Sequence, residues 1–539
     1  LDRGAEAPRD LGHVGKNGDG FERPTIEITV EEHEVNDAAI AALSADPDLY
    51  QRGNLLVRVL REEPRPDDMD TGRDPGSLAI TTIHAATLRE RLTRHACWVK
   101  RKKGEDGEPQ LVPAHPPDWS VQAVANRGTW RGIRPLEGVT EVPLLRADGS
   151  ILETPGYDRR SGILYTPEIE YPKVPESPTR EDAQAAVQKL YDLVVDFPFK
   201  DENHKAAWLS ALLTAFARPT LPGPAPLFLF DANTSGAGKT FLADIISIVG
   251  IGRSVGRTAL PSSEEEMDKC TLAMAVHGAK MVLFDNTATG SAIGGPALDA
   301  ALTAMTRSGR LLGATKWMEG IPFSPLFVVT GNNAALKADI LRRIVASRLE
   351  SPEEHPEERD GFAIPNLLEH VRAHRGSLAV AALTILRAYI IAGRPIPEPK
   401  PKPVGAPFGP WDALVRHATY WATGYDPHAT KGSAKTTDKT TLQLPDLIEG
   451  WAVLCRAAGK EGLTSGQAIR ELEKDPADHE SLRALLTEST RDGKLPSPQQ
   501  LGNLLGKVRG RVVKGRSLNT SVYEGTNLWF VHTLPTKGD

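Results

Sequence analysis

Cysteine is scarce in this sequence, and long uncharged apolar runs are absent. The three cysteines, Cys97, Cys270 and Cys455, lie far apart and form no CxxC pair. This spacing argues against a disulfide framework and a cysteine-bound zinc, and it favours a reducing compartment, so we expect a cytoplasmic protein. No apolar stretch reaches the roughly 18 residues that a membrane span needs, and no signal-peptide layout opens the chain. We therefore expect no membrane partner.

A strong net charge is also absent, because the formal charge is −6 over 539 residues. That balance argues against a protein that coats nucleic acid with its whole surface, but it allows a local basic face. The chain is too long for one hydrophobic core, so we expect about three or four domains. Because the first residue is Leu1 rather than Met, we also expect that a segment is missing upstream.

The chain does contain a succession of segment types, from which we predict seven parts. Proline-spaced linkers and turn-rich stretches separate regions of strand-like and helical periodicity. In chain order we expect a mobile tail at 1–24, an α+β module at 25–175, a helical collar or linker at 176–220, an α/β domain with a parallel sheet at 221–395, a proline-rich linker at 396–410, a helical segment at 411–460, and a winged helix, three helices followed by short strands, at 461–539.

The most informative segment is Pro226–Gly250, PLFLFDANTSGAGKTFLADIISIVG. An apolar strand leads into a glycine-bearing loop that closes on Gly-Lys-Thr and opens a helix, a pattern typical of a loop that binds the phosphates of ATP. We expect Lys239 on the β- and γ-phosphates and the Thr240 hydroxyl on Mg²⁺. Asn233 stands where the common pattern begins with Gly, and an ordinary glycine-rich turn is the alternative interpretation. The residues expected to bind the nucleotide are Asn233, Thr234, Ser235, Gly236, Ala237, Gly238, Lys239, Thr240 and Phe241.

A second apolar strand, KMVLFDN at 280–286, ends in Asp285 and Asn286. A carboxylate at the carboxyl end of a buried parallel strand faces the nucleotide crevice, so we predict that Asp285 holds Mg²⁺ together with Thr240. A polar cap on a strand is the alternative. Asn286 occupies the position at which many ATPases of this kind carry an acidic base, so the general base stays open between Asp285 and the glutamates at 264–266.

A third strand, PLFVVT at 325–330, runs into Gly331, Asn332 and Asn333. An amide at this strand end can hydrogen-bond the γ-phosphate or the attacking water, so either asparagine is a candidate sensor, although GNN alone also fits a turn. Downstream, Arg342 and Arg343 could reach the γ-phosphate bound to a neighbouring subunit, or they could form surface salt bridges. Because they follow a phosphate loop and two polar strand ends, we favour the first role.

In this order, NTSGAGKT, MVLFDN, LLGATKWMEGIPFSPLFVVTGNN and LRRIVASRLE resemble the superfamily 3 helicase core of the AAA+ class, especially the primase-helicases of phages, plasmids and integrated elements. The resemblance covers about residues 180–355 well and the C-terminal part more loosely. It implies that 221–395 is an AAA+ P-loop ATPase domain, that six copies form a ring with ATP between subunits, and that the ring encircles one DNA strand. Single-stranded and forked DNA and a primase or replisome protein are the implied partners.

In the resembled family, the interval between the strand-end carboxylate and the sensor strand contains a hairpin that touches DNA in the ring channel. Here that interval, TRSGRLLGATKWMEG, contains Arg310, Lys316 and Trp317, and Lys316 is the expected tip contact. A cation beside an indole suits single-stranded DNA of any sequence. Alternatively, Trp317 packs in a core and Lys316 is merely solvated.

The C-terminal region is locally basic although the whole chain is acidic. In PSPQQLGNLLGKVRGRVV, polar residues lead a helix whose far end carries Lys507, Arg509 and Arg511. That pattern is typical of a helix that docks on duplex DNA, and a solvated basic face is the alternative.

The leading interpretation is an ATP-driven hexameric helicase that moves on single-stranded DNA during replication of a phage or mobile element. A AAA+ ATPase that loads or remodels proteins and a nucleotide-gated DNA-binding protein are the alternatives. Residues 25–175 contain no HxH and no Cys/His cluster, so we expect a binding or ring-assembly role there rather than a primase or nuclease centre. A primase, if there is one, is expected upstream of Leu1 or on another chain.

Overall fold

The computed structural model describes most of the chain, which divides into two compact units. Unit 1 is Leu1–Ala334 with Arg342–Ser433, and unit 2 is Ala335–Leu341 with Ala434–Asp539. The described residues are 15–16, 22–61, 78–105, 107–287, 292–310, 317–337, 339–353, 355–404, 407–430, 444–474, 478–488, 490, 494–510, 512–513, 516–523 and 526–533.

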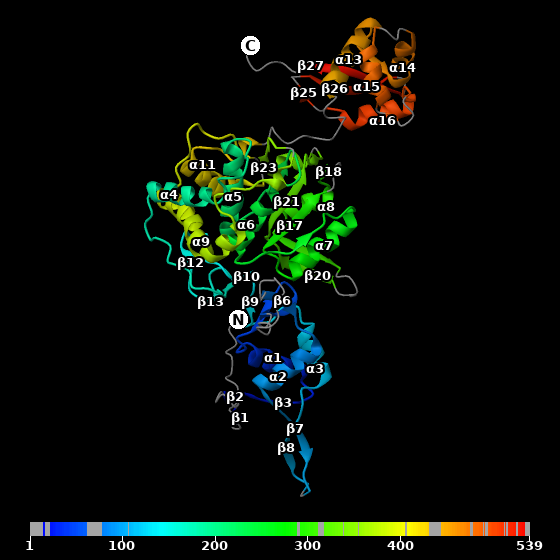
Figure 1. Ribbon diagram of the computed structural model, residues 1–539. Helices are drawn as coiled ribbons and strands as arrows, with labels where there is room; N and C mark the ends of the chain where they lie inside the picture. The colour runs from blue at the N-terminus through cyan, green and yellow to red at the C-terminus, as the bar shows by residue number, and fades with distance from the viewer. Residues whose placement is uncertain are drawn as a thin grey trace. The chain divides into compact units, whose positions relative to one another are not determined.

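The N-terminal region of unit 1 combines three helices with short sheets (Figure 1). Its buried core includes Trp98 and Trp130, which pack among the apolar faces of the helices. One sheet has the strand order β6-β5-β4-β9 and a second has the order β3-β7-β8. The elements are β3 (Thr25–Glu27), α1 (Glu32–Leu43), β4 (Leu49–Arg52), β5 (Leu55–Arg61), β6 (Leu78–Thr82), α2 (Ala85–His95), β7 (Cys97–Lys103), β8 (Pro109–Pro113), α3 (Asp118–Ala125) and β9 (Arg134–Pro135).

Short strands and two helices connect this region to the central sheet. Short paired strands come first, and two helices occupy most of the predicted helical collar. Thr179 caps the first helix through a capping box with Asp182, and Asp201 caps the second. The elements are β10 (Gly138–Thr140), β11 (Leu144–Leu145), β12 (Ile151–Leu152), β13 (Gly156–Asp158), β14 (Ile163–Tyr165), α4 (Arg180–Asp192) and α5 (Glu202–Ala217). Within the predicted tail, β1 (Gly15–Lys16) pairs antiparallel with β2 (Glu22–Arg23).

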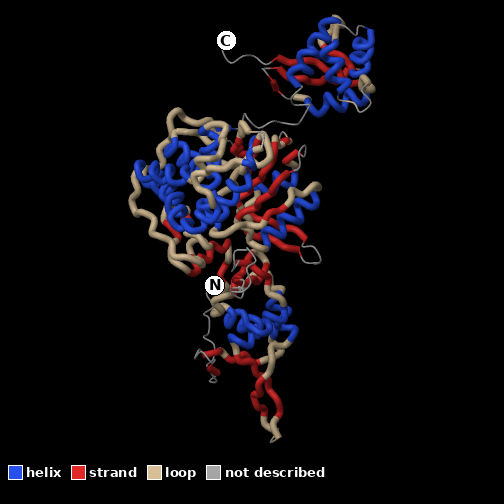
Figure 2. Tube along the Cα trace, viewed as in Figure 1, coloured by secondary structure: helices blue, strands red, loops and turns tan. Residues whose placement is uncertain are grey.

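A five-stranded parallel sheet lies at the centre of unit 1, with the order β16-β17-β21-β15-β23. The predicted α/β structure with a parallel sheet is therefore confirmed, whereas the bounds 221–395 stay a prediction. Figures 1 and 2 show α5 and α6 on one side of the sheet and α7 and α8 on the other. The strands are β15 (Leu227–Ala232), β16 (Arg257–Thr258), β17 (Met281–Thr287), β21 (Leu326–Asn332) and β23 (Ile344–Leu349), and the helices are α6 (Lys239–Ile251), α7 (Glu264–Val276) and α8 (Pro296–Thr303).

The parallel arrangement follows from the strand sequences. All six residues of β15 are buried, and the first four of β17 and the first six of β21 are buried too. Such continuous burial is what strands covered by helices on both faces require. Because the strands run in the same direction, their carboxyl ends gather at one edge of the sheet, where ligands of parallel sheets bind.

The remaining elements of unit 1 pack around this sheet. A separate antiparallel hairpin joins β19 (Thr306–Arg310) to β20 (Trp317–Pro322). A long helix, α9 (Leu367–Ile391), lies against α4 and α6. The other short elements are η1 (Arg218–Thr220), β18 (Ala292–Ile293), η3 (Pro356–Glu358), α10 (Gly409–Trp411), a π-helical turn (Asp412–Arg416) and α11 (His417–Thr423). The turn η2 (Ile340–Arg342) contains residues assigned to both units.

Unit 2 contains helices and a four-stranded antiparallel sheet with the order β24-β27-β26-β25. Trp451 and Trp529 lie in its core, and the Trp451 indole donates to the Trp529 carbonyl at 3.1 Å. Ser497 caps α16 through a capping box with Gln500. The elements are β22 (Ala335–Leu336), α13 (Leu444–Ala457), β24 (Gly462–Thr464), α14 (Ser465–Lys474), α15 (Glu480–Glu488), α16 (Pro498–Val508), β25 (Val512–Val513), β26 (Arg516–Tyr523) and β27 (Thr526–Thr533). Among the described helices of both units, none has the length and apolarity of a membrane span.

Candidate active site

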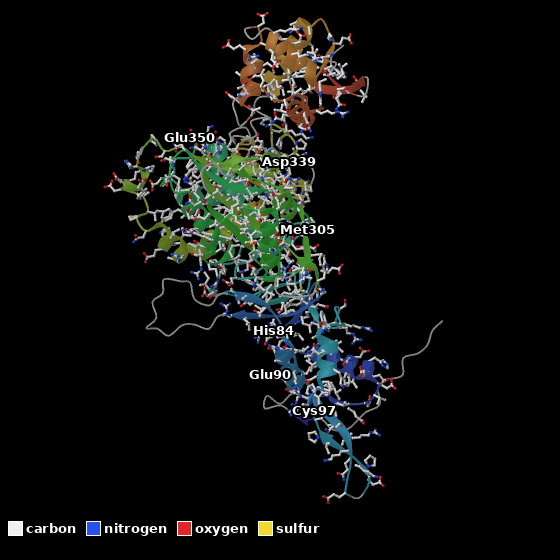
Figure 3. The ribbon with its side chains drawn as sticks, turned by 90° about the vertical axis from the view of Figure 1, so that its right-hand side faces the viewer. His84, Glu90, Cys97, Met305, Asp339 and Glu350 are labelled. Carbon is white, nitrogen blue, oxygen red and sulfur yellow. The ribbon has the colours of Figure 1, made fainter. Side chains whose placement is uncertain are left out.

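The loop between β15 and α6 has the backbone that its glycines predict. Gly236 and Gly238 adopt φ values of 75° and 96°, in the left-handed region that favours glycine. A Cβ on Gly236 would lie 2.4 Å from Oε2 of Glu357, and one on Gly238 would lie 2.7 Å from Cε1 of Phe197. Both positions therefore favour glycine for conformation, and Gly238 also for space, because the Phe197 ring is less able to move away than the end of the Glu357 side chain. In Figure 3, the label Glu350 shows where β23 ends, at the carboxyl edge of the parallel sheet. The label Met305 shows where β19 begins.

Asn233, which replaces the usual first glycine, fastens the start of the loop to the chain that follows β23. Its side-chain Nδ2 donates to the Ser351 carbonyl at 2.8 Å, and its Oδ1 accepts from the Ser351 N–H at 3.0 Å. The side-chain amide thus imitates a strand and extends the pairing of β15 with β23 by one residue. These two hydrogen bonds to Ser351 are a structural reason for Asn233 at the position where the common pattern has Gly.

Lys239 and Asn332 meet at the end of the sheet. Lys239 is the first residue of α6, is only 8% exposed, and donates from Nζ to Oδ1 of Asn332 at 2.6 Å. Burial lowers the pKa of Lys239, whereas the carboxylates of Asp231 and Asp285 act in the opposite direction. Of the two candidate sensors, Asn332 is therefore the one in contact with the loop lysine.

Asp285 lies among hydroxyl groups. Thr240 donates from Oγ1 to Oδ1 of Asp285 at 3.1 Å, and Thr330 donates to the same oxygen at 2.6 Å. The other carboxylate oxygen lies 3.6 Å from Nη1 of Arg257, which also pairs with Asp244. The structure thus brings together the two residues that the sequence assigns to Mg²⁺, and it adds Thr330 and Arg257.

Asn286 follows at an irregular point of β17. The register with β21 shifts after Phe284, and Asn286 has a φ of 53°. Its N–H donates to Oγ1 of Thr330 at 2.7 Å. This bulge turns the strand end so that the carboxylate of Asp285 meets Thr240.

Two of the three alternative bases in the first turn of α7, Glu264 and Glu265, have partners elsewhere. Glu264 accepts from the N–H of Ala297 at 2.7 Å, at the start of α8. Glu265 forms an ion pair with Lys269 at 2.7 Å.

Asn333 belongs to a second network, beside the first. Its Nδ2 donates to the carbonyl of Asn233 at 3.1 Å, and its Oδ1 accepts from Arg348 at 2.9 Å. Arg348 also forms an ion pair with Asp231, whose Oδ1 accepts from the N–H of Ala334 at 2.9 Å. Asp231 and Arg348 are direct neighbours in the register of β15 and β23. The sequence analysis did not predict this ion pair. An acidic and a basic residue near the ends of two apolar strands, Asp231 and Arg348, were the features that could have suggested it.

The two adjacent arginines have different environments. Arg343 forms an ion pair from Nε to Oδ1 of Asp299 in α8 at 3.2 Å, and the Asp299 side chain is only 17% exposed. Arg342 ends η2 and is exposed. Arg343 is therefore the more buried of the two arginines, and Arg342 is the more exposed.

An apolar cavity of about 160 Å³ adjoins the phosphate loop. Its floor is the backbone of Gly236, Ala237 and Gly238, and its walls include Phe197, Pro198, Phe241, Phe362 and Ile364. Phe241 follows Thr240 on α6 and is half exposed. Except for Phe241, the walls come from segments that carry no motif, so the sequence alone did not reveal them.

The residues proposed to contact DNA are described in part. Trp317 begins β20 and is 58% exposed, so it does not pack in a core. Arg310 ends β19 and Arg509 follows α16, and both side chains are exposed. Lys316, Arg511 and the side chain of Lys507 lie outside the described residues.

Comparisons with known proteins give distant similarities only. No family model matches the chain, and no curated protein matches it. Among solved structures, the chain is similar to the apo C-terminal region (305–718) of NrS-1, with 10% identity, a TM-score of 0.36, and coverage of 87% of this chain and 95% of that chain.

Two further similar structures are those of helicases. SCCmec type IV Cch, described as an active helicase, is 11% identical with a TM-score of 0.31, over 90% of this chain and 97% of that chain. JCV helicase is 15% identical with a TM-score of 0.19, over 38% of this chain and 61% of that chain. At these TM-scores the similarity does not establish a fold or an activity for this chain. The proposed function therefore rests on the side chains of the site.

Proposed function

We propose that this protein is an ATP-dependent DNA helicase of the AAA+ superfamily 3 type, which translocates as a hexamer on single-stranded DNA in the replication of a phage or mobile element. One observation carries the proposal: the ends of β15, β17 and β21 bring Lys239, the Thr240–Asp285 pair and Asn332 together in one site. A phosphate loop, a strand-end carboxylate and a strand-end amide are the parts that hydrolysis of a nucleoside triphosphate requires.

The loop and the cavity fit ATP as substrate. The N–H groups at the start of α6 and the ammonium of Lys239 suit the phosphates, because a helix N-terminus and a lysine both attract anions. The apolar cavity beside Gly236–Gly238, with Phe197 and Phe241 in its walls, suits a base, which buries a flat apolar face. To bind the phosphates, the ammonium of Lys239 would give up at least part of its hydrogen bond to Asn332 and donate to phosphate oxygens instead.

The donor set at Asp285 fits Mg²⁺. One carboxylate and the Thr240 hydroxyl converge at 3.1 Å, and Mg²⁺ is commonly held by one or two protein oxygens plus phosphates and water. Among the described residues, no group of three or more His, Cys, Asp or Glu side chains could hold a metal, so a transition-metal centre has no support there. When bound, Mg²⁺ would supply neutralising charge to the phosphates. Asn332 would align the attacking water, and Asp285 remains the candidate base.

Two observations support assembly and DNA contact. Arg342 has an exposed side chain whereas Arg343 is partly buried, so Arg342 is the better candidate to reach the ATP of a neighbouring subunit. The exposed indole of Trp317 and the exposed Arg310 lie at the facing ends of β19 and β20, where they could stack on a base and meet a phosphate.

Unit 2 would add a contact with duplex DNA. Its order of α13, β24, α14, α15, α16 and a terminal hairpin supports a winged-helix domain, with α16 as the helix that docks on DNA and Arg509 at its end.

Strand displacement on a forked duplex tests this proposal. The wild-type protein should displace the strand with ATP and Mg²⁺, and chelation of the metal should stop it. Lys239→Ala should abolish displacement, while Lys189→Ala, which removes an exposed lysine of α4, should have no effect. Displacement that survives Lys239→Ala would exclude this site as the motor.

A further inference from the structure

The N-terminal module contacts the β19–β20 hairpin through the turn between β4 and β5. Asn54 donates from Nδ2 to the carbonyl of Trp317 at 3.0 Å, and its Oδ1 accepts from the N–H of Glu319 at 3.1 Å. The N–H of Asn54 also donates to the carbonyl of Glu319 at 3.3 Å. The side chain of Asn54 therefore pairs with β20 as a neighbouring strand would, on the backbone groups that β19 leaves available.

Gly53 makes this close approach possible. Its φ is 53°, and a Cβ at this position would lie 2.4 Å from the carbonyl oxygen of Glu319 and 2.8 Å from Cδ1 of Ile321. Only glycine lets the turn come this near to β20 without strain.

Arg52 fixes the same turn to the central region. Its Nη1 donates to the carbonyls of Leu136 and Glu137, at 3.0 and 2.7 Å, within the N-terminal region. Its Nη2 donates to the carbonyl of Ala275 in α7 at 3.1 Å and to that of Pro322 in β20 at 2.6 Å. Burial lowers the pKa of Arg52 to about 10, so the guanidinium stays charged near neutral pH.

The other strand of the hairpin is held by α7. Arg307 of β19 forms an ion pair with Asp268 and donates to Oγ1 of Thr271 at 3.1 Å. The hairpin is therefore fixed on both strands, by a helix of the central region on one side and by the N-terminal module on the other.

We propose that Asn54 is a positioning residue: it holds the start of β20, so that the N-terminal module sets where Trp317 is presented to single-stranded DNA. The contact with DNA rests on the proposed function, whereas the hold on β20 does not. This assigns to the N-terminal module a mechanical role, in which a shift of the module moves the hairpin with it.

Amide hydrogen exchange, read at single residues by mass spectrometry without DNA or nucleotide, tests the hold. Asn54→Ala should raise exchange at Glu319 by roughly 2- to 10-fold, the effect of losing one hydrogen bond. Gly320 is the internal control, because its N–H donates instead to Oγ of Ser308 at 3.1 Å. Ser308→Ala should give the converse, with faster exchange at Gly320 and no change at Glu319. Unchanged exchange at Glu319 in Asn54→Ala would overturn the proposal.

Affinity for single-stranded DNA tests the positioning. Asn54→Ala should weaken binding of a fluorescent oligonucleotide by roughly 3- to 10-fold, and it should add little to the loss caused by Trp317→Ala, because both act through one contact. Asn126→Ala is the matched control and should bind as the wild type, because the Asn126 side chain donates to the carbonyl of Gln122 within the same module. Asn54→Asp keeps the acceptor for the Glu319 N–H but loses the donor to the Trp317 carbonyl. Its affinity for single-stranded DNA should therefore lie between that of Asn54→Ala and that of the wild type.

The two proposals fail in different ways. Full additivity of Asn54→Ala and Trp317→Ala, or unchanged affinity in Asn54→Ala, would overturn the positioning role even if exchange changes. Absence of DNA binding by the wild type would instead overturn the proposed function and the DNA part of this inference, while the exchange experiment would still decide whether Asn54 holds β20.

Discussion

Two adjacent asparagines at the end of β21 contact different parts of the site. Asn332 accepts from the ammonium of Lys239, whereas Asn333 joins the loop carbonyl of Asn233 to Arg348. In the proposed function, the first contact would be exchanged for a contact with phosphate or water during the reaction cycle. The second contact holds the loop in place and has a structural character.

Replacing each asparagine by alanine should separate these roles. Asn332→Ala should lower kcat by about 100-fold, the usual effect of losing one donor to a transition state, while ATP affinity changes only a few-fold. Asn333→Ala should mainly lower the melting temperature, because the carbonyl of Asn233 and the guanidinium of Arg348 lose partners, at about 1–2 kcal/mol. Steady-state kinetics and thermal melting of both variants make the comparison. The opposite pattern would make Asn333 the sensor.

At the scale of elements, the strands that form the site could be predicted from the sequence and the contacts between them could not. The apolar runs before the phosphate loop, before Asp285 and before Asn332 fall in β15, β17 and β21, because strands buried on both faces must be continuously apolar. The strand order also places their polar ends at one edge. The roles of Asn332 and Asn333 stayed open because a GNN sequence does not say which amide faces the lysine.

The unpredicted contacts join residues far apart in the chain. Asn233 bonds with Ser351, which is 118 positions away, and Asn54 bonds with Trp317, which is 263 positions away. The wall of the cavity at Phe197 likewise comes from a segment before the phosphate loop. Periodicity and motif spacing report local structure, so they do not contain these pairings.

The β15–α6 loop packs closely against the cavity wall, because Gly238 lies next to the ring of Phe197. This contact gives a prediction for Gly238. Gly238→Ala should prevent nucleotide binding and destabilise the protein by about 1–3 kcal/mol, because the new Cβ meets Phe197 in a backbone conformation unfavourable for alanine. Gly128→Ala is the control for conformation alone, since Gly128 has a φ of 83° and no atom within 4 Å of its Cβ position. Binding of a fluorescent ATP analogue and thermal melting are the measurements. Equal effects of the two variants would exclude a steric role of Phe197.

At the scale of the whole molecule, the proposal depends on a site completed by a second copy of the chain. Within one chain the site has a lysine, a carboxylate and an amide, and Arg348 is engaged with Asp231. Arg342, whose side chain is exposed, is the residue proposed to act on the site of a neighbouring copy in a ring.

Mixing variants tests this requirement. Arg342→Ala should bind ATP normally but lose turnover, and Lys239→Ala should lose turnover by itself. A mixture of the two should regain activity, because some interfaces combine an intact lysine with an intact arginine. Arg343→Ala should instead lower the melting temperature, since Asp299 loses its partner. A mixture without any recovered activity would exclude action between subunits.

Steady-state ATPase activity with and without single-stranded DNA, for the wild type and Lys239→Ala, decides whether the protein is a motor on DNA. We expect hydrolysis that depends on Lys239 and rises several-fold with DNA, since a motor on DNA couples the two ligands. Hydrolysis that depends on Lys239 but ignores DNA would favour an ATPase that remodels proteins. No hydrolysis under either condition would favour a nucleotide-gated DNA-binding protein, and either result would contradict the account.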